Sequence, residues 1–339
     1  MFFNGKPTSD IFESSDVSSS DDDSDYVMSP IPNAVNINSP NNPNKLNTTH
    51  PNNAEDVPIE LRLVEYNNYG MSHRTIADAT KSANYIYKVV NDPSIKANVV
   101  VIVECFQPIT YNSLVDTFGT DWSFSPHVPP ENMFMGSGVV IGVKNTFGNI
   151  RDIKTTTFTA CCQADCLAEK GASLLTIQLK QSSTADQTTP TTKQVCIVAT
   201  HLQSLIIPVV CQLNLRDGQI QQITDMISDA RRDNIIHKED VVVITGDFND
   251  LDLGHHYNSS SARHGKAVGH HATIMNANVV QTKENVSCAT NAFGCLDLVY
   301  IQKTKNEQQT KKHSASRVEI VTIPGNVSDH EPIFTTVML

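Results

Sequence analysis

The chain has 339 residues, of which 39% are hydrophobic and 18% charged, and its formal net charge is −11. This balance is typical of a globular protein, and eight cysteines are too few for a disulfide scaffold of this length. The acidic surplus argues against tight nucleic-acid binding, and no run of about 18 apolar residues predicts a membrane span.

Residues 1–57 form a segment rich in Ser, Asp, Asn and Pro. They carry nine acidic residues and two lysines, and so −7 of the net charge. Such a segment cannot bury enough apolar surface to offset its chain entropy, so we predict a disordered acidic tail. The opening MFFNGKPTSD has no basic start followed by an apolar stretch, which predicts a cytoplasmic or peripheral membrane location, with secretion left open.

Residues 58–339 carry short apolar runs rich in Val and Ile, which predict buried strands. The runs are ELRLVEYN (60–67), NVVVIVECF (98–106), SGVVIGVK (137–144), ASLLTIQL (172–179), QVCIVATHL (194–202), VVVITGDFN (241–249), LDLVYIQ (296–302) and VEIVTI (318–323). Segments 73–90 and 215–232 have helical periodicity instead. Many strands with few helices between them predict one domain of two packed sheets with helices outside.

Polar side chains stand at the ends of several predicted strands. They are Asn67, Glu104, His201, Asp247, Asn249 and Asp297, followed near the C-terminus by Asp329 and His330. Strand ends can meet at one rim of a sheet, where a site can form. Oxygen ligands of this kind suit Mg²⁺ rather than Zn²⁺, and a His with an Asp partner suits a general base. The set therefore predicts hydrolysis of a phosphate ester by an activated water.

This ordered set of residues resembles the motifs of the endonuclease/exonuclease/phosphatase superfamily. The likeness includes Gly246-Asp247-Phe248-Asn249 and Ser328-Asp329-His330, and runs from about residue 60 to the C-terminus. It implies a DNase-like fold: a four-layer α/β/β/α sandwich of two mixed β-sheets flanked by helices. We therefore assign residues 58–339 to one catalytic domain of this type.

Three segments resemble the bacterial and neutral sphingomyelinases within that superfamily: DCLAEKG (165–171), THLQS (200–204) and YNNYGMSHRTIADATKSANYI (66–86). The resemblance implies a Mg²⁺-dependent phosphodiesterase, with Mn²⁺ as an alternative ion, that cleaves sphingomyelin to ceramide and phosphocholine. It also implies peripheral contact with a membrane, a monomer and no nucleic-acid partner.

The resemblance assigns a role to each site residue. Glu104, Asn67 and Asp329 would bind the metal, and Asp247 with Asn249 would hold the scissile phosphate and the ion or water around it. His330 would accept the proton of the attacking water and Asp297 would orient His330, while His201 would contact the phosphate. Asp165 and Lys170 would belong to a loop that switches between inactive and active arrangements.

The residues leave other functions open. A nuclease or a phosphoinositide phosphatase would use the same fold and metal, and a degenerate domain would bind lipid or protein without catalysis. Asp165 and Lys170 could equally form a plain surface ion pair. Cys161, Cys162 and Cys166 lie in CCQADCLAEKG, but they lack the paired spacing and the distant partner pair of a zinc site.

Overall fold

The computed structural model describes most of the predicted catalytic domain. The described residues are 59–69, 75–129, 135–159, 161, 168–180, 193–204, 211–249, 274–275, 277–279, 297–302 and 317–339. All of them belong to one compact unit, Asp56–Leu339. The predicted disordered tail, residues 1–57, and Asp165 of the predicted switch loop lie outside the described residues.

Two six-stranded mixed sheets form the centre of this unit. The first has the order β11-β12-β1-β2-β4-β3, with β1 at Glu60–Asn67, β2 at Val99–Val103, β3 at Trp122–Phe124, β4 at Val140–Lys144, β11 at Arg317–Ile320 and β12 at Ile333–Met338. The second has the order β5-β6-β7-β8-β10-β9, with β5 at Gly148–Thr157, β6 at Gly171–Leu179, β7 at Gln194–His201, β8 at Val241–Asp247, β9 at Ala277–Val279 and β10 at Asp297–Gln302. One central pair in each sheet is parallel, β1 with β2 and β7 with β8.

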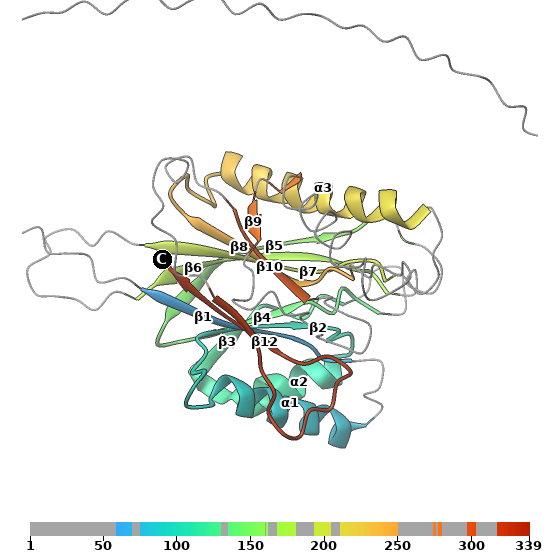
Figure 1. Ribbon diagram of the computed structural model, residues 1–339, viewed down its shortest axis with the longest axis vertical. Helices are drawn as coiled ribbons and strands as arrows, with labels where there is room; N and C mark the ends of the chain where they lie inside the picture. Colours follow the sequence, from blue (N-terminus) through green and yellow to red (C-terminus); the bar gives the residue numbers. More distant parts are fainter. Residues whose placement is uncertain are drawn as a thin grey trace, which may run out of the picture. The chain divides into compact units, whose positions relative to one another are not determined.

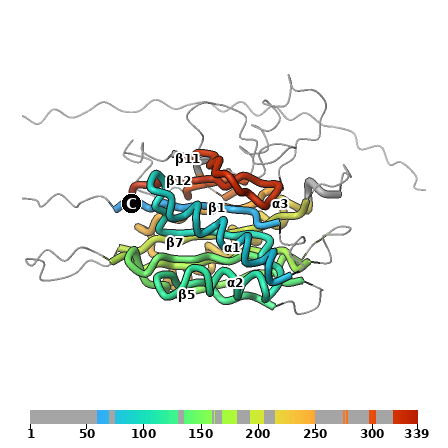
Figure 2. The backbone as a smooth tube through the Cα atoms, turned by 90° about the horizontal axis from the view of Figure 1, so that it is seen from below, coloured from blue at the N-terminus to red at the C-terminus, as the bar shows by residue number. Residues whose placement is uncertain are grey.

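Helices cover the outer faces of the two sheets (Figure 1). The helix α1, Ile76–Val90, and the helix α2, Pro108–Phe118, lie side by side over the first sheet (Figure 2). A short 3₁₀ turn, Gly119–Asp121, follows α2, and the helix α3, Cys211–Arg232, covers the second sheet. The resulting layers confirm the expected α/β/β/α sandwich.

Three apolar clusters hold the layers together. The middle one lies between the sheets and includes Leu63, Val101, Ile197 and Val243, each fully buried. The other two lie beneath α1 and α2 and beneath α3. The β-strands alternate their side chains between these clusters, so every second residue of a central strand points toward the opposite sheet.

This alternation decides which polar residues of β1 can reach the second sheet. Leu61 and Leu63 lie in the middle cluster, whereas Val64 and Tyr66 lie in the cluster beneath α1. Glu65 and Asn67 share the parity of Leu63 and therefore face the second sheet. Both side chains are buried, at 0% and 1% exposure.

All eight predicted strands and both predicted helices occur in the structure, with small shifts at their ends. The helix α3 begins at Cys211, four residues before the start of its predicted segment at 215. The sequence patterns gave no sign of α2, β3, β5, β9 and β12. Within the described residues, no helix combines the length and the apolar character needed to span a bilayer.

Candidate active site

The register of the second sheet aligns three of the predicted site residues. His201 ends β7 and pairs with Asp247 at the end of the parallel strand β8. Asp247 in turn pairs with Asp297, the first residue of the antiparallel strand β10. The three side chains therefore start from neighbouring positions at the same end of three adjacent strands, and all three residues are buried.

The first sheet brings two further residues to the same edge. Asn67 ends β1 opposite Val103, the last residue of β2, and Glu104 follows directly. The amide nitrogen of Asn67 donates hydrogen bonds to Asp247 Oδ2 at 2.9 Å and to Glu104 Oε1 at 3.4 Å. Glu104 has a left-handed backbone, with φ at 59°, which redirects the chain beyond the strand end. These bonds join the two sheets at the predicted metal site.

The carboxyl groups of Glu104 and Asp247 converge on one position. Each has an oxygen near His201 Nε2, at 3.9 Å for Glu104 Oε1 and 3.8 Å for Asp247 Oδ2. Burial and the charge of Asp297 raise the pKa of Asp247 to about 7, and burial raises the pKa of Glu104. Burial is the first cause of both shifts, because it penalises the charged form of a carboxylate, and a cation nearby would oppose it.

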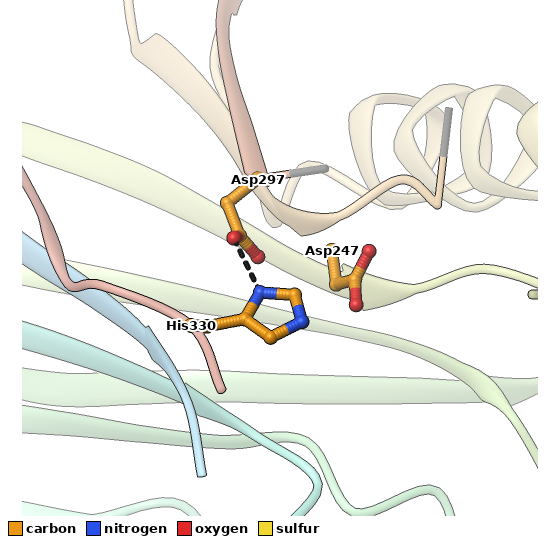
Figure 3. A group of neighbouring side chains, drawn as sticks. All are labelled: Asp247, Asp297 and His330. Carbon is orange, nitrogen blue, oxygen red and sulfur yellow. Dashed lines mark hydrogen bonds and ion pairs between the residues drawn. The ribbon is translucent and has the colours of Figure 1, made fainter. Parts of the chain in front are cut away.

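A divalent cation fits this environment. Glu104 and Asp247 offer hard oxygen ligands, and a cation between them would stabilise both carboxylates in their charged form. Asn67 presents its amide nitrogen to both carboxylates, and its amide oxygen accepts from the backbone N–H of Tyr69 at 3.0 Å, so Asn67 would bind the ion only after its amide turns over. Asp247, Asp297 and His330 form a second overlapping group, whose possible ligand atoms all lie within 4.8 Å of one another (Figure 3). Glu104 and Asn67 of the predicted metal ligands lie in the first of these groups, and Asp247, which was predicted to hold the phosphate, is shared by both groups.

His330 and Asp297 form the predicted pair. His330 Nδ1 lies 2.7 Å from Asp297 Oδ2, and the other ring nitrogen points toward Asp247 (Figure 3). Burial lowers the pKa of His330, but the charge of Asp297 and its hydrogen bond, with the charges of Asp247 and Asp329, raise it to about 10. The carboxylate therefore favours the imidazolium form, as a partner of a general base does.

Lys170 is part of the site rather than a surface residue. Its ammonium group lies 3.0 Å from His201 Nε2 and donates to the carbonyl oxygen of Leu202 at 2.9 Å. Because an ammonium can only donate, His201 Nε2 accepts and the ring proton belongs on Nδ1. Burial first, and then the charges of Lys170 and His330, lower the pKa of His201 well below its ordinary value. His201 is therefore a neutral imidazole, and Lys170 is buried too deeply for a plain surface ion pair.

Asn249 lies beside this group in a left-handed conformation, with φ at 48°. Its side-chain amide donates to Leu202 O at 2.9 Å, and its backbone N–H donates to Asp247 Oδ1 at 2.7 Å. Gly246, within β8, permits the close approach of β7, because a Cβ there would lie 1.9 Å from the carbonyl oxygen of Thr200. The GDFN motif is thus a compact turn that fixes Asp247 against the next strand.

Asp329 is placed differently from the other predicted residues. It is exposed, and its carboxylate accepts a long hydrogen bond of 3.4 Å from the hydroxyl of Ser328. Its charge nevertheless acts on the pKa values of both Glu104 and His330. Asp329 therefore lies at the outer margin of the site, and its role as a metal ligand stays a prediction.

Three residues that support the site were missed by the sequence analysis. Arg216 on α3 is buried and donates to the backbone carbonyl of Asn249, while Gln219 accepts from the backbone N–H of Gln203 at 3.0 Å. Glu65 is fully buried, and burial and the charges of Asp297 and Asp247 raise its pKa well above the ordinary value. An acid inside a predicted apolar strand was the signal available for Glu65, whereas nothing in the helix pattern marked Arg216.

Solved structures share this fold. The chain is similar to SmcL, with 16% identity, a TM-score of 0.63 and coverage of 82% of this chain and 99% of that one. A beta toxin mutant from Staphylococcus aureus with bound magnesium ions is 18% identical, with a TM-score of 0.59 and coverage of 82% of this chain and 99% of that one. Sphingomyelinase C from Streptomyces griseocarneus is 16% identical, with a TM-score of 0.58 and the same two coverages. No protein-family model and no curated protein matches the sequence. At these identities, the likeness shows the DNase-like fold alone.

Proposed function

We propose that this protein is a divalent-metal-dependent phosphodiesterase that hydrolyses sphingomyelin to ceramide and phosphocholine. The observation that carries the proposal is the junction of Glu104, Asn67 and Asp247 with the pair of Asp297 and His330. It combines a set of oxygen ligands with a polarised imidazole at one edge of the sandwich. That combination suits attack of water on a phosphodiester.

The roles of the residues follow from their contacts. Glu104 and Asp247 would hold Mg²⁺, and Asn67 would join them through its amide oxygen once the amide turns away from Tyr69. The ion, when bound, supplies a Lewis acid for the phosphoryl oxygens. A cation bound beside Asp247 would offset the negative charge that raises the pKa of His330 and so favour its neutral form, which would accept the proton of the attacking water on Nε2 while Nδ1 stays bonded to Asp297. The water oxygen bonds to phosphorus, the bond from phosphorus to the ceramide oxygen breaks, and the ceramide oxygen takes up a proton.

The positive side of the site supports a phosphate-bearing substrate. Lys170 places an ammonium group beside His201, and its charge acts on Glu104 across the predicted metal position. Charges fixed in a buried site of this kind stabilise the phosphate as negative charge develops on its oxygens. In the structure His201 Nε2 accepts a hydrogen bond from Lys170, so His201 would have to give up this bond before Nε2 could contact the phosphate.

The choice of sphingomyelin rests on two features. Lys170 belongs to the DCLAEKG segment, which resembles sphingomyelinases, and its side chain lies within the site. Residues 58–339 carry a net charge of about −4 by their sequence, which disfavours a polyanionic nucleic acid. The proposal includes a monomer that works at the surface of a membrane, from the cytoplasm or as a peripheral protein.

The test is hydrolysis by the full chain with Mg²⁺ against four substrates: sphingomyelin, phosphatidylcholine, a phosphoinositide and plasmid DNA. We expect phosphocholine release from sphingomyelin, lost in EDTA and lost with His330→Ala. The matched control is His237→Ala, which should leave the rate unchanged. His237 is exposed and lies outside the site, just after the turn that follows α3. Nicking of plasmid without release of phosphocholine would overturn the proposal in favour of a nuclease.

A further inference from the structure

The loop between β11 and β12 carries His330, and it reaches the site through a specific set of contacts with β1. The loop lies beside α1 in Figure 1, where Tyr85 donates to the carbonyl of Ile323 at 3.3 Å and Lys88 to that of Pro324 at 3.1 Å. It then crosses the end of β1 before it enters β12 at Ile333. The position of His330 therefore depends on how this crossing is held.

Asn326 uses both ends of its side-chain amide at the crossing. Its oxygen accepts from the hydroxyl of Tyr66 at 2.7 Å and from the backbone N–H of Ser328 at 3.1 Å. Its nitrogen donates to the backbone carbonyl of His330 at 2.7 Å. One side chain thus closes the turn around residues 326–330 and joins it to β1.

Ser328 makes the matching contacts on the other side of the strand end. Its hydroxyl donates to the backbone carbonyl of Asn67 at 2.6 Å and accepts from the backbone N–H of His330 at 3.1 Å. Tyr66 and Asn67 are consecutive residues of β1 with side chains on opposite faces of the sheet. The loop is therefore held from the helix side through Tyr66 and at the strand end through the carbonyl of Asn67.

We propose that Asn326 is a positioning residue for catalysis. Its side-chain amide links the backbone carbonyl of His330 to the hydroxyl of Tyr66 on β1, and this link holds His330 against Asp297. The same strand end carries Asn67, whose amide contacts both Glu104 and Asp247. Asn326 thus fixes the distance between the general base and the predicted metal ligands. Asn326 touches neither substrate nor the reacting atoms in this arrangement, so its effect passes through His330.

The geometry predicts a graded series of variants. Asn326→Ala removes all three contacts of the amide and should lower kcat by about tenfold to a hundredfold, the scale of a small misplacement of a catalytic group. Tyr66→Phe removes one hydroxyl and keeps the ring, so kcat should fall by about fivefold. Asn326→Asp keeps the acceptor but sets a carboxylate oxygen against the carbonyl of His330, and should resemble Asn326→Ala. KM should stay within about twofold throughout, because substrate contacts remain.

The control is Asn149→Ala, at an exposed asparagine of the edge strand β5, and it should leave kcat unchanged. A double variant, Tyr66→Phe with Asn326→Ala, should match Asn326→Ala within about twofold, because the hydroxyl acts through the missing amide. A purely structural role would instead lower the melting temperature and leave kcat of the folded protein intact. The imidazole ¹⁵N resonances of His330 give a second readout, and they should move in Asn326→Ala but not in Asn149→Ala.

The kcat measurements rest on the proposed function. The ¹⁵N resonances of His330 do not, so they distinguish a failure of the proposed function from a failure of the role given to Asn326. If the wild-type chain hydrolyses none of the substrates, the proposed function fails and the resonances of His330 alone decide the role of Asn326. Unchanged resonances with kcat within about twofold of the wild type in Asn326→Ala would overturn the inference. Should Asn326→Ala not fold, Tyr66→Phe takes its place, and full activity in that variant would equally overturn it.

Discussion

Replacing Asp297 by Asn tests the His330 pair most directly, because the two side chains have nearly the same shape and differ in charge. The carboxylate lies 2.7 Å from His330 Nδ1, and Asp297 is 3% exposed. Its charge and hydrogen bond are the leading causes that raise the pKa of His330 to about 10 against the lowering effect of burial. Without them, only the charges of Asp247 and Asp329 oppose the lowering effect of burial, so the pKa of His330 should fall well below its wild-type value.

The catalytic effect should be larger than the structural one. An amide at position 297 can bond to Nδ1 through its nitrogen, which would place the ring proton on the nitrogen needed to accept one from water. Loss of a general base in the correct form costs about 10²- to 10⁴-fold in kcat. We therefore expect a fall in this range, with a folded protein and a KM close to that of the wild type.

Two measurements check this expectation. The ¹⁵N resonances of the 12 histidines are followed over pH in metal-free protein, and His330 is assigned from the signals that vanish in His330→Asn. The rate of phosphocholine release is measured in parallel with Mg²⁺. If the pKa of His330 in Asp297→Asn stays within about half a unit of the wild type, the carboxylate does not control the ring, and the prediction fails.

Three further predictions concern stability, charge and metal. In metal-free protein the folded state binds more protons at His330 than the unfolded state between pH 6.5 and about 10, so the free energy of unfolding should fall as pH rises through this window. The slope should reach at most about 1.4 kcal/mol per pH unit and flatten in His330→Asn; equal slopes in urea titrations would contradict this. Lys170→Met should lower kcat by about tenfold or more and raise the pKa of His201, and an unchanged rate would exclude Lys170 from the site's chemistry. Mg²⁺ at about 100 times its Kd should stabilise the fold by about 2.7 kcal/mol, and Asp247→Asn should reduce the shift in melting temperature; a shift equal to the wild type's would place the ion elsewhere.

The strands could be predicted from the sequence, and so could most of the residues that the structure brings together in the candidate site, because both depend on short-range patterns. Apolar runs mark central strands, and a polar residue at the end of a run marks a rim, so Asn67, His201 and Asp247 could be placed without knowing the topology. The edge strand β5 escaped prediction because six of its ten residues are exposed and its sequence, GNIRDIKTTT, has no apolar run. Helix α2 begins with a proline and contains several Ser and Thr residues, which weaken the helical pattern.

The contacts that unite the site could not be predicted, because they join segments far apart in the chain. Asn67 meets Asp247 across 180 positions, and Tyr66 meets Asn326 across 260. Asn326 lies in a loop whose local pattern predicts only a turn. Its amide can bond to both Tyr66 and His330 only because β1 and β12 are neighbouring strands. Pattern gives the members of the site, whereas the pairing of the strands gives their distances.

The site concentrates like charges, and this explains why a metal would belong there. Glu65, Asp247 and Asp297 interact through their charges in the layer between the sheets, and burial raises the pKa of Glu65 and of Asp247. Lys170 and His330 supply positive charge to Asp247, and yet its pKa stays near 7. Buried carboxylates of one sign cost free energy unless a cation or a proton neutralises them. The apolar layers offset that cost in the folded protein, so the arrangement is stable enough to persist, and a divalent ion would relieve it most at Asp247, the residue that both ligand groups share.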